Sequence, residues 1–144
     1  MHMAFENPAR DEIKKLLEQN PVVAVVGLSD NPERTSHSVS AAMKERGYRI
    51  IPVNPAAPAI LGETSYASLL DVPEPIGIVN VFRRSEFTPD IAREAVQSGA
   101  KVLWLQLGVY SEEAADIAQA GGLTVIMDRC IKVEDSILRP AIGG

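Results

Sequence analysis

The stretch VVAVVGLSDNPERTS, residues 22–36, decides the fold and raises the question of the ligand. It begins with apolar, β-branched residues that end at Gly27, a pattern typical of a buried β-strand followed by a tight turn. The dinucleotide-binding fingerprint G-x-G-x-x-G needs three glycines, but Ser29 and Pro32 occupy its second and third glycine positions. The loop has therefore either lost its ligand or binds a different one.

The bulk composition indicates one folded domain. The chain has 144 residues, of which 46% are hydrophobic and 23% charged, close to the average for a globular protein. We expect a single domain over residues 1–144, with residues 1–20 containing an N-terminal helix packed on it. No apolar run approaches the roughly 18 residues of a membrane span, and the N-terminus lacks the pattern of a secretory signal. The one cysteine, Cys130, cannot form an internal disulfide, which favours a reducing, cytoplasmic location.

Charge and aromatic content argue against nucleic acid as a partner. The net charge is −5, and only 5% of the residues are aromatic. The overall field repels phosphate backbones, and the aromatic residues are too few for a base-stacking platform. The partner that we expect is a small molecule, while a protein partner or a homo-oligomer stays open.

Five apolar runs alternate with helical patterns along the chain. The runs are residues 22–28, 48–54, 76–82, 101–108 and 123–128, and the helical patterns are residues 8–20, 36–47, 88–99 and 111–122. Strands that are apolar on both faces and separated by helices form a parallel sheet covered on both sides. This predicts an α/β fold, a three-layer Rossmann-like doubly wound parallel sheet of five strands. We expect the order 3-2-1-4-5, with the glycine loop at the topological switch point.

Ligands of such sheets bind beyond the carboxyl ends of the strands, so the loops there carry the functional predictions. The loop after the first strand combines a helix N-terminus with a guanidinium and several hydroxyls, from Ser29, Arg34, Thr35, Ser36 and Ser38. Free N–H groups and arginine favour a phosphate. The alternative is a polar loop that merely caps the helix, with a solvated arginine.

The exits of the second and third strands narrow the choice of ligand. A classical NAD site has an acidic residue near the end of the second strand, but here Asn54 lies between prolines. This permits a ribose that carries a phosphate, so NADP is more compatible than NAD. Arg83 and Arg84 follow the third strand and converge with Arg34 if the fold is as predicted; otherwise they are a solvated surface pair.

No complete catalytic or metal-binding arrangement is found. His37 begins a helix without a serine and acid at a recognisable spacing, and we interpret it as a surface residue. Cys130, His37 and Asp128 lack the spacing of metal ligands. Cys130 follows the fifth strand, where a buried structural thiol and a ligand-facing thiol are both possible. We therefore predict no catalytic residue and no metal ligand.

Four stretches in order resemble one family. They are GLSDNPERTSHSVSAAMKERGYRIIPVNP (27–55), VNVFRR (79–84), EAVQSGAKVLWLQLGV (94–109) and MDRCIKVE (127–134). They resemble the stand-alone coenzyme A (CoA)-binding proteins, small bacterial and archaeal Rossmann-like domains that are similar to the nucleotide-binding domain of the succinyl-CoA synthetase α subunit. The resemblance extends from the first helix to Glu134.

The resemblance implies a set of ligand contacts. The first loop would hold phosphates of CoA through Gly27, Ser29, Arg34 and Ser36. The V-N-P segment would lie against the adenosine part through Val53, Asn54 and Pro55. Phe82, Arg83 and Arg84 would line the adjoining groove, and the strand-four exit from Gln106 to Gly108 would lie nearer the pantetheine arm.

The implied function is the binding of CoA or an acyl-CoA without catalysis. The synthetase uses a phosphorylated histidine from a further domain and a β subunit, and this sequence contains neither, so ligase activity is not expected. Two alternatives stay open from the residues alone. One is an enzyme or redox domain that uses NADP or another nucleotide, and the other is a protein-interaction module with a vestigial site.

Overall fold

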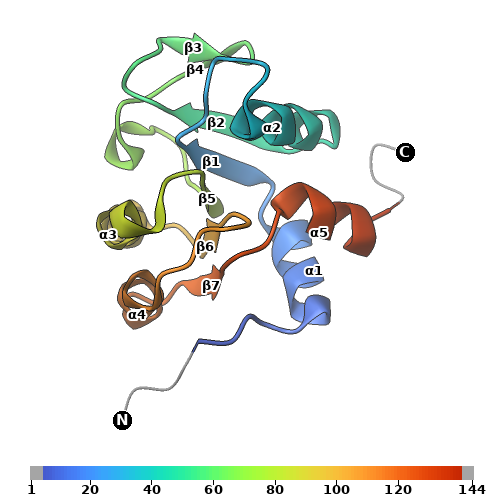
Figure 1. Cartoon of the computed structure of the whole chain (residues 1–144), viewed down its shortest axis with the longest axis vertical. Helices are drawn as coiled ribbons and strands as arrows, with labels where there is room; N and C mark the ends of the chain where they lie inside the picture. Colours follow the sequence, from blue (N-terminus) through green and yellow to red (C-terminus); the bar gives the residue numbers. More distant parts are fainter. Residues whose placement is uncertain (1–4, 141–144) are drawn as a thin grey trace.

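The structure is a computed structural model that describes residues 5–140, and its centre is a parallel sheet of five strands (Figure 1). In chain order the strands are β1 (Val22–Val26), β2 (Arg49–Val53), β5 (Ile78–Val81), β6 (Val102–Leu105) and β7 (Thr124–Ile126). Helices cover both faces, which confirms the predicted three-layer α/β fold.

Three helices cover each face if the short helix η1 is included. On one face lie α1 (Arg10–Gln19), α2 (Thr35–Glu45) and α5 (Ile131–Leu138). On the other lie η1 (Leu69–Asp71), α3 (Thr88–Ser98) and α4 (Glu112–Ala120). The helix expected within residues 1–20 is α1, which buries Ile13 and Leu17 against the sheet. Residues 1–4 of that expected segment lie outside the described residues.

The order of the strands differs in one respect from the expected 3-2-1-4-5. The sheet reads β2-β1-β5-β6-β7, so the third of the five strands, β5, pairs with β1 and does not lie outside β2. The connection over residues 54–77 contains no α-helix and crosses the face opposite α2, through η1. A right-handed connection over that face returns the chain past β1, which places β5 beside it. The switch point expected at the glycine loop therefore lies between β1 and β5.

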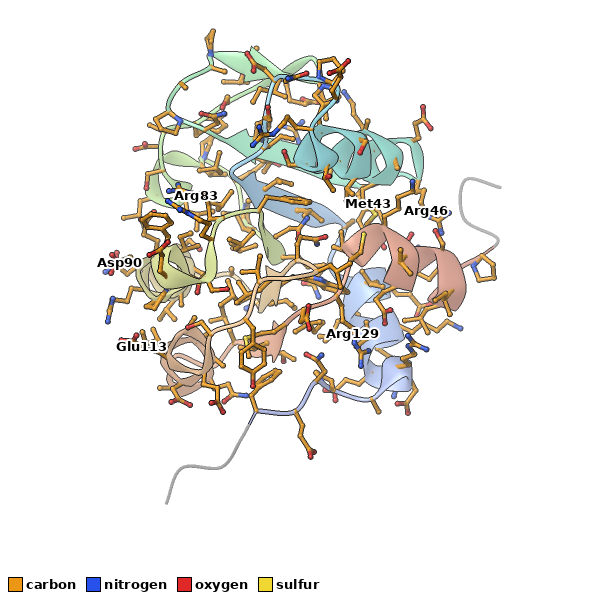
Figure 2. The ribbon with its side chains drawn as sticks, in the orientation of Figure 1. Met43, Arg46, Arg83, Asp90, Glu113 and Arg129 are labelled. Carbon is orange, nitrogen blue, oxygen red and sulfur yellow. The ribbon has the colours of Figure 1, made fainter. Side chains whose placement is uncertain are left out.

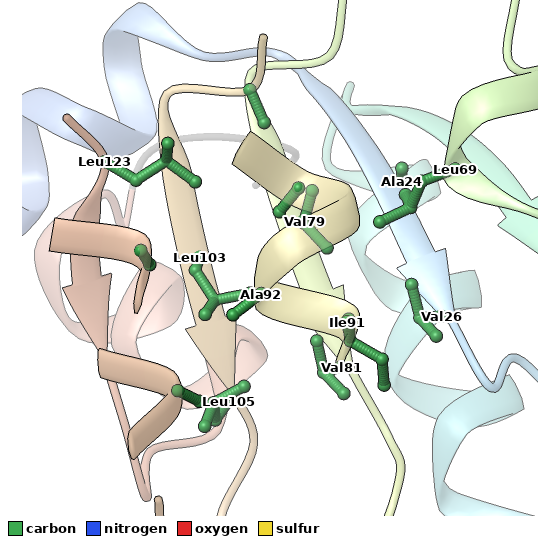
Figure 3. Close-up of a cluster of buried hydrophobic side chains, with 14 of the residues drawn as sticks. Ala24, Val26, Leu69, Val79, Val81, Ile91, Ala92, Leu103, Leu105 and Leu123 are labelled. Carbon is green, nitrogen blue, oxygen red and sulfur yellow. The ribbon is translucent and has the colours of Figure 1, made fainter. Parts of the chain in front are cut away.

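The sheet is apolar on both faces because successive side chains of each strand point to opposite sides. In β1, Ala24 and Val26 belong to the cluster under α3 and α4, whereas Val23 and Val25 belong to the cluster under α1 and α2. Figure 3 shows the first cluster, in which side chains of β1, β5, β6 and α3 meet. Burial of this kind contributes about 25 cal/mol per Å² of apolar surface, the main stabilising contribution of the fold.

The outer edge of β2 is partly covered. A short antiparallel hairpin, β3 (Ala59–Ile60) and β4 (Glu63–Thr64), follows β2. Beyond it, the N–H of Tyr66 donates to Pro52 O at 3.0 Å, and the N–H of Asn54 donates to Tyr66 O at 2.8 Å. Arg49 and Glu63 form an ion pair at 2.6 Å, and the hydrogen bonds from Arg49 and Lys44 hold the pKa of the Glu63 carboxyl below its usual value.

Helix α5 is fixed to α2 through the fully buried carboxylate of Asp135. Arg46 Nε donates to Asp135 Oδ2 at 2.5 Å, and Tyr48 Oη donates to Oδ1 at 2.6 Å. Figure 2 shows Arg46 where the end of α2 meets α5. Arg139 also donates to Tyr48 Oη, and burial together with the bond to Asp135 raises the pKa of Tyr48. The position of α5 matters because Cys130 is the N-cap residue that directly precedes this helix.

Candidate ligand site at the carboxyl edge of the sheet

A cavity of about 630 Å³ opens beyond the carboxyl ends of β1, β5 and β6, and we call it the larger cavity. It lies at the switch point between β1 and β5, where doubly wound sheets bind their ligands. Its lining comprises Gly27, Ser29, Arg34, Thr35, Ser36, Phe82, Arg83, Arg84, Gln106, Leu107, Gly108, Val109 and Cys130.

A second cavity of about 370 Å³, the smaller cavity, lies beyond the ends of β1 and β2. It is lined by Val26, Gly27, Val53, Asn54, Pro55, Ala67, Ser68, Leu69, Arg83, Ile91 and Glu94. Gly27 and Arg83 line both cavities, so the two adjoin each other. Each of the twelve residues for which the sequence predicts ligand contact lines at least one of them.

Gly27 allows the exits of β1 and β5 to approach each other. Its φ of +84° is a conformation that other residues rarely adopt, and its N–H donates to Val53 O at 3.1 Å. A Cβ atom at this position would lie 2.6 Å from Phe82 O and 3.0 Å from Arg83 Cδ. The wall shared by the two cavities is therefore built on a residue without a side chain.

The loop after β1 is held in shape by its own hydrogen bonds. The N–H of Ser29 donates to Ser36 Oγ at 3.0 Å, and the N–H of Asn31 donates to Ser29 Oγ at 3.1 Å. The residue that precedes α2, Arg34, makes no side-chain bond to the first turn of the helix. Thr35 and Ser36 of the first turn of α2 line the larger cavity, so the partial positive charge of a helix N-terminus lies at this cavity.

Three arginines, Arg34, Arg83 and Arg84, line the larger cavity. The side chain of Arg34 is exposed and has no hydrogen bond or ion pair with residues 5–140. The guanidinium groups of Arg83 and Arg84 lie over the ring of Phe87, at 4.8 and 5.3 Å from its centroid. Figure 2 places Arg83 at the edge of the molecule near α3. Arg84 also pairs with Glu86 at 3.4 Å, on the surface, where such a pair contributes little.

Asn54 braces the two loops on either side of it. Its Nδ2 donates to Leu28 O at 2.9 Å, and its Oδ1 accepts from the N–H of Ala56 at 2.8 Å. Both side-chain atoms are therefore bonded to the protein, although the residue lines the smaller cavity. Its amide joins the exits of β1 and β2 and contributes surface to the cavity.

The exit of β6 provides an amide and a tight turn. Gln106 is only 4% exposed, and its Nε2 donates to Oδ1 of the buried Asn80 at 2.5 Å. Gly108 has φ of +85°, and its N–H donates to Asp128 Oδ1 at 2.7 Å. The turn places Leu107, Gly108 and Val109 along the larger cavity, beside Cys130.

Several lining residues carry no recognisable signal in the sequence. Thr35 and Cys130 both line the larger cavity, although the sequence assigns neither of them a ligand contact. The side of the smaller cavity formed by Ala67, Ser68, Leu69, Ile91 and Glu94 comes from η1, the residues before it, and α3. No motif marks these residues. His37 is absent from the residues that line the two cavities.

No helix within residues 5–140 is long and apolar enough to cross a membrane. Nor does this range contain a group of three or more His, Cys, Asp and Glu side chains arranged to hold a metal ion.

Comparison with known proteins gives relatives of similar length. The uncharacterized protein YneT of Bacillus subtilis (strain 168) is 49% identical over 135 residues, which cover 94% of this chain and 100% of YneT. A hypothetical protein from Pyrococcus horikoshii OT3 has a similar structure, with a TM-score of 0.89 and 32% identity over 95% of this chain and 99% of the other. A protein from Thermus thermophilus gives a TM-score of 0.87 and 34% identity, covering 91% and 99% of the two chains.

Larger relatives contain this unit as a small part. The ADP-forming acetate–CoA ligase II of Archaeoglobus fulgidus is 30% identical over 93 residues, which cover 63% of this chain but only 14% of the ligase. The family model described as CoA binding domain matches residues 21–136, from the start of β1 into α5. The matched range includes every residue that lines the two cavities, and the chain belongs to the CoA binding domain family.

Proposed function

We propose that this chain binds CoA or an acyl-CoA across the two adjoining cavities and catalyses no reaction of its own. The observation that carries the proposal is the set of three arginines and an open helix N-terminus at one cavity of a chain whose net charge is −5. On a protein that is acidic overall, a local cluster of positive charge attracts anionic ligands to that place. CoA has such an anionic part in its phosphate groups.

The larger cavity suits the phosphates. The N-terminus of α2 and the guanidinium of Arg34, which has no partner within residues 5–140, offer donors and positive charge to phosphate oxygens. Arg83 lies between this cavity and the smaller one, where it can reach phosphates on either side of the ribose. The hydroxyl of Ser36 is used to hold the backbone of Ser29, so we assign Ser36 to shaping the loop.

The smaller cavity suits the adenosine part. Its walls include the apolar side chains of Val26, Val53, Leu69 and Ile91 at the ends of β1 and β2 and on η1 and α3. An aromatic base gains binding energy from contact with such a surface. The resemblance to CoA-binding proteins gives the same assignment for Val53, Asn54 and Pro55.

The far side of the larger cavity suits the pantetheine arm. Leu107 and Val109 give apolar contact along the turn after β6, and the buried Gln106 offers an amide oxygen for which residues 5–140 supply no donor. An amide-containing chain can use both kinds of surface. The thiol or acyl end would then lie on the side of Cys130.

The absence of catalysis is proposed from the side chains at the site. No histidine is among the described residues that line the cavities, and within the described chain the Cys130 thiol has no hydrogen-bonded base to activate it. Cys130 lines the larger cavity and the carboxylate of Glu94 lines the smaller one. A thiol without a base and a carboxylate in the other cavity do not form a recognised catalytic arrangement.

Ligand-dependent stability tests the proposal. A ligand that binds only the folded state stabilises it by RT ln(1 + [L]/Kd), about 2.7 kcal/mol at a hundredfold excess over Kd, which raises the melting temperature by several degrees. We expect this shift with CoA, a smaller one with dephospho-CoA and almost none with NAD. Equal shifts with NAD and CoA, or none with CoA, would remove the proposal. Acetyl-CoA that is consumed by the protein, as followed by mass spectrometry, would contradict the absence of catalysis.

A further inference from the structure

The smaller cavity contains a carboxylate that phosphate binding does not explain. Glu94 belongs to α3 and is half-buried. It lines this cavity and carries a charge opposite to that of Arg83. No ion pair joins Glu94 to a cation within residues 5–140. A carboxylate placed there without a positive partner would repel a phosphate, so this cavity suits a part of the ligand that offers a hydrogen-bond donor.

The hydrogen bonds around Glu94 fix its orientation and leave one oxygen available. Ser68 Oγ donates to Glu94 Oε1 at 2.9 Å, and the same Oγ accepts from the N–H of Leu70 at 3.2 Å as the cap of η1. Both polar side-chain atoms of Asn54 are already bonded to the protein. Glu94 Oε2 is therefore left without a partner in the described chain. Apart from the guanidinium of Arg83 at the shared wall, the other polar side-chain atoms of this cavity are bonded.

The shape and chemistry of the cavity restrict what can pair with this oxygen. The group must present apolar faces to Val26, Val53 and Ile91 and an N–H or O–H donor at its edge. An adenine ring has both, because its exocyclic amino group lies at the edge of a flat aromatic system. A purine with a keto group at the same position presents lone pairs to the carboxylate.

We infer that Glu94 accepts a hydrogen bond from the exocyclic amino group of the adenine ring and so restricts the site to aminopurine nucleotides. This inference rests on the proposed binding of CoA. A charge-assisted hydrogen bond of this kind and the penalty for its loss together give roughly 10- to 100-fold discrimination between the two purines. Ser68 is the positioning residue, since its hydroxyl turns Oε2 toward the ring.

Two ligands that differ at position 6 of the purine, and with it in the proton on N1, test the inference. We would titrate the whole chain with adenosine 3′,5′-bisphosphate and with inosine 3′,5′-bisphosphate and compare the dissociation constants by calorimetry. The wild type should bind the adenosine compound 10- to 100-fold more tightly. In Glu94→Gln the side-chain amide can turn either its oxygen or its NH₂ group to the purine, so the preference should fall to within about threefold.

Asp90→Asn is the matched control. Asp90 is an exposed carboxylate one turn earlier on α3, it pairs with Arg93 at 2.6 Å, and it lines neither cavity. This variant should keep the full preference for adenosine. Because the inosine compound tests the wild type directly, the comparison does not depend on the stability of any variant.

Three outcomes would overturn the inference while CoA binding persists. They are equal affinity of the wild type for the two bisphosphates, an unchanged preference in Glu94→Gln, and an equal loss of affinity for both ligands in that variant. The last result, together with weak binding of 2′-deoxyadenosine 3′,5′-bisphosphate, would assign Glu94 to a ribose hydroxyl. If neither CoA nor the adenosine compound binds the wild type, the proposed function itself fails.

Discussion

The backbone of Gly27 lies so close to that of Phe82 that a Cβ atom on Gly27 would stand 2.6 Å from Phe82 O. These residues directly follow the two strands between which the strand order reverses, β1 and β5. A carbonyl oxygen of the backbone cannot rotate away as a flexible side chain can. The glycine is therefore required by contact as well as by its φ of +84°.

Gly27→Ala should lower the free energy of unfolding by about 2–4 kcal/mol, since strain from positive φ adds to the clash with Phe82. Gly99→Ala is the matched control. Gly99 has φ of +80° but nothing within 4 Å of its Cβ position, so this variant should lose only about 1 kcal/mol. Urea denaturation measures both, and equal losses would show that contact with Phe82 is unimportant.

Arg34→Ala should weaken CoA binding by about 1.5–3 kcal/mol and leave the stability of the unliganded protein unchanged, because the guanidinium has no partner within the described chain. The difference from wild type should shrink as salt is raised, since ions screen the charges. Calorimetry at two salt concentrations measures this. Arg93→Ala, on α3 outside both cavities, is the control and should bind CoA as the wild type does. Unchanged affinity in Arg34→Ala would count against phosphate binding by the first loop.

Cys130 provides a footprint of the ligand. It is the only cysteine of the chain and lines the larger cavity, so alkylation by iodoacetamide reports on that place alone. Acetyl-CoA, which has no free thiol to consume the reagent, should slow the labelling about tenfold at ten times its Kd, because only the free protein reacts. NAD at the same concentration should not slow it. Labelling that acetyl-CoA leaves unchanged would place the pantetheine arm elsewhere.

Tyr48→Phe should lower the free energy of unfolding by about 1–3 kcal/mol at neutral pH, because the buried Asp135 loses a hydrogen-bond donor. Burial and the bond to Asp135 raise the pKa of Tyr48 in the folded state. The folded state thus keeps a proton that the unfolded state releases near pH 10, and wild-type stability should fall as the pH rises above about 10.

The pH dependence separates Tyr48 from the other tyrosines. Denaturation at pH 8 and pH 11 should show a smaller loss on going to high pH in Tyr48→Phe than in wild type. Tyr110 is 45% exposed and its Oη has no bond to residues 5–140, so Tyr110→Phe should keep the wild-type fall. An identical fall in all three proteins would contradict the coupling to Asp135.

Much of the site could be predicted because its residues follow the ends of strands. The run that ends at Gly27 is short, β-branched and bounded by a glycine, so both the strand and the loop follow from local preferences. Arg34, Arg83 and Gln106 follow three different strands, and parallel strands bring their carboxyl ends to one edge. Their place at one edge of the sheet thus follows from the fold class alone, whereas their meeting at one cavity depends on β1, β5 and β6 being neighbours.

The strand order and the side of the smaller cavity formed by η1 and α3 could not be predicted in this way. Both possible orders use the same alternation of strands and helices, and only the path of residues 54–77 across one face decides between them. Glu94 and Asp90 are both carboxylates on α3, and the sequence alone does not distinguish their roles. Which of them faces a cavity depends on how α3 packs beside η1, and this is a property of tertiary structure.

The covered edge at β2 limits how the sheet can grow. A foreign strand that approached β2 would meet Pro52, which has no N–H to offer, and would find Pro52 O and the N–H of Asn54 already bonded to Tyr66. The ion pair between Arg49 and Glu63 places charge beside the same edge. The protein is thereby guarded at this edge against the strand-to-strand pairing that starts aggregation, by the same connection that returns the chain to β5.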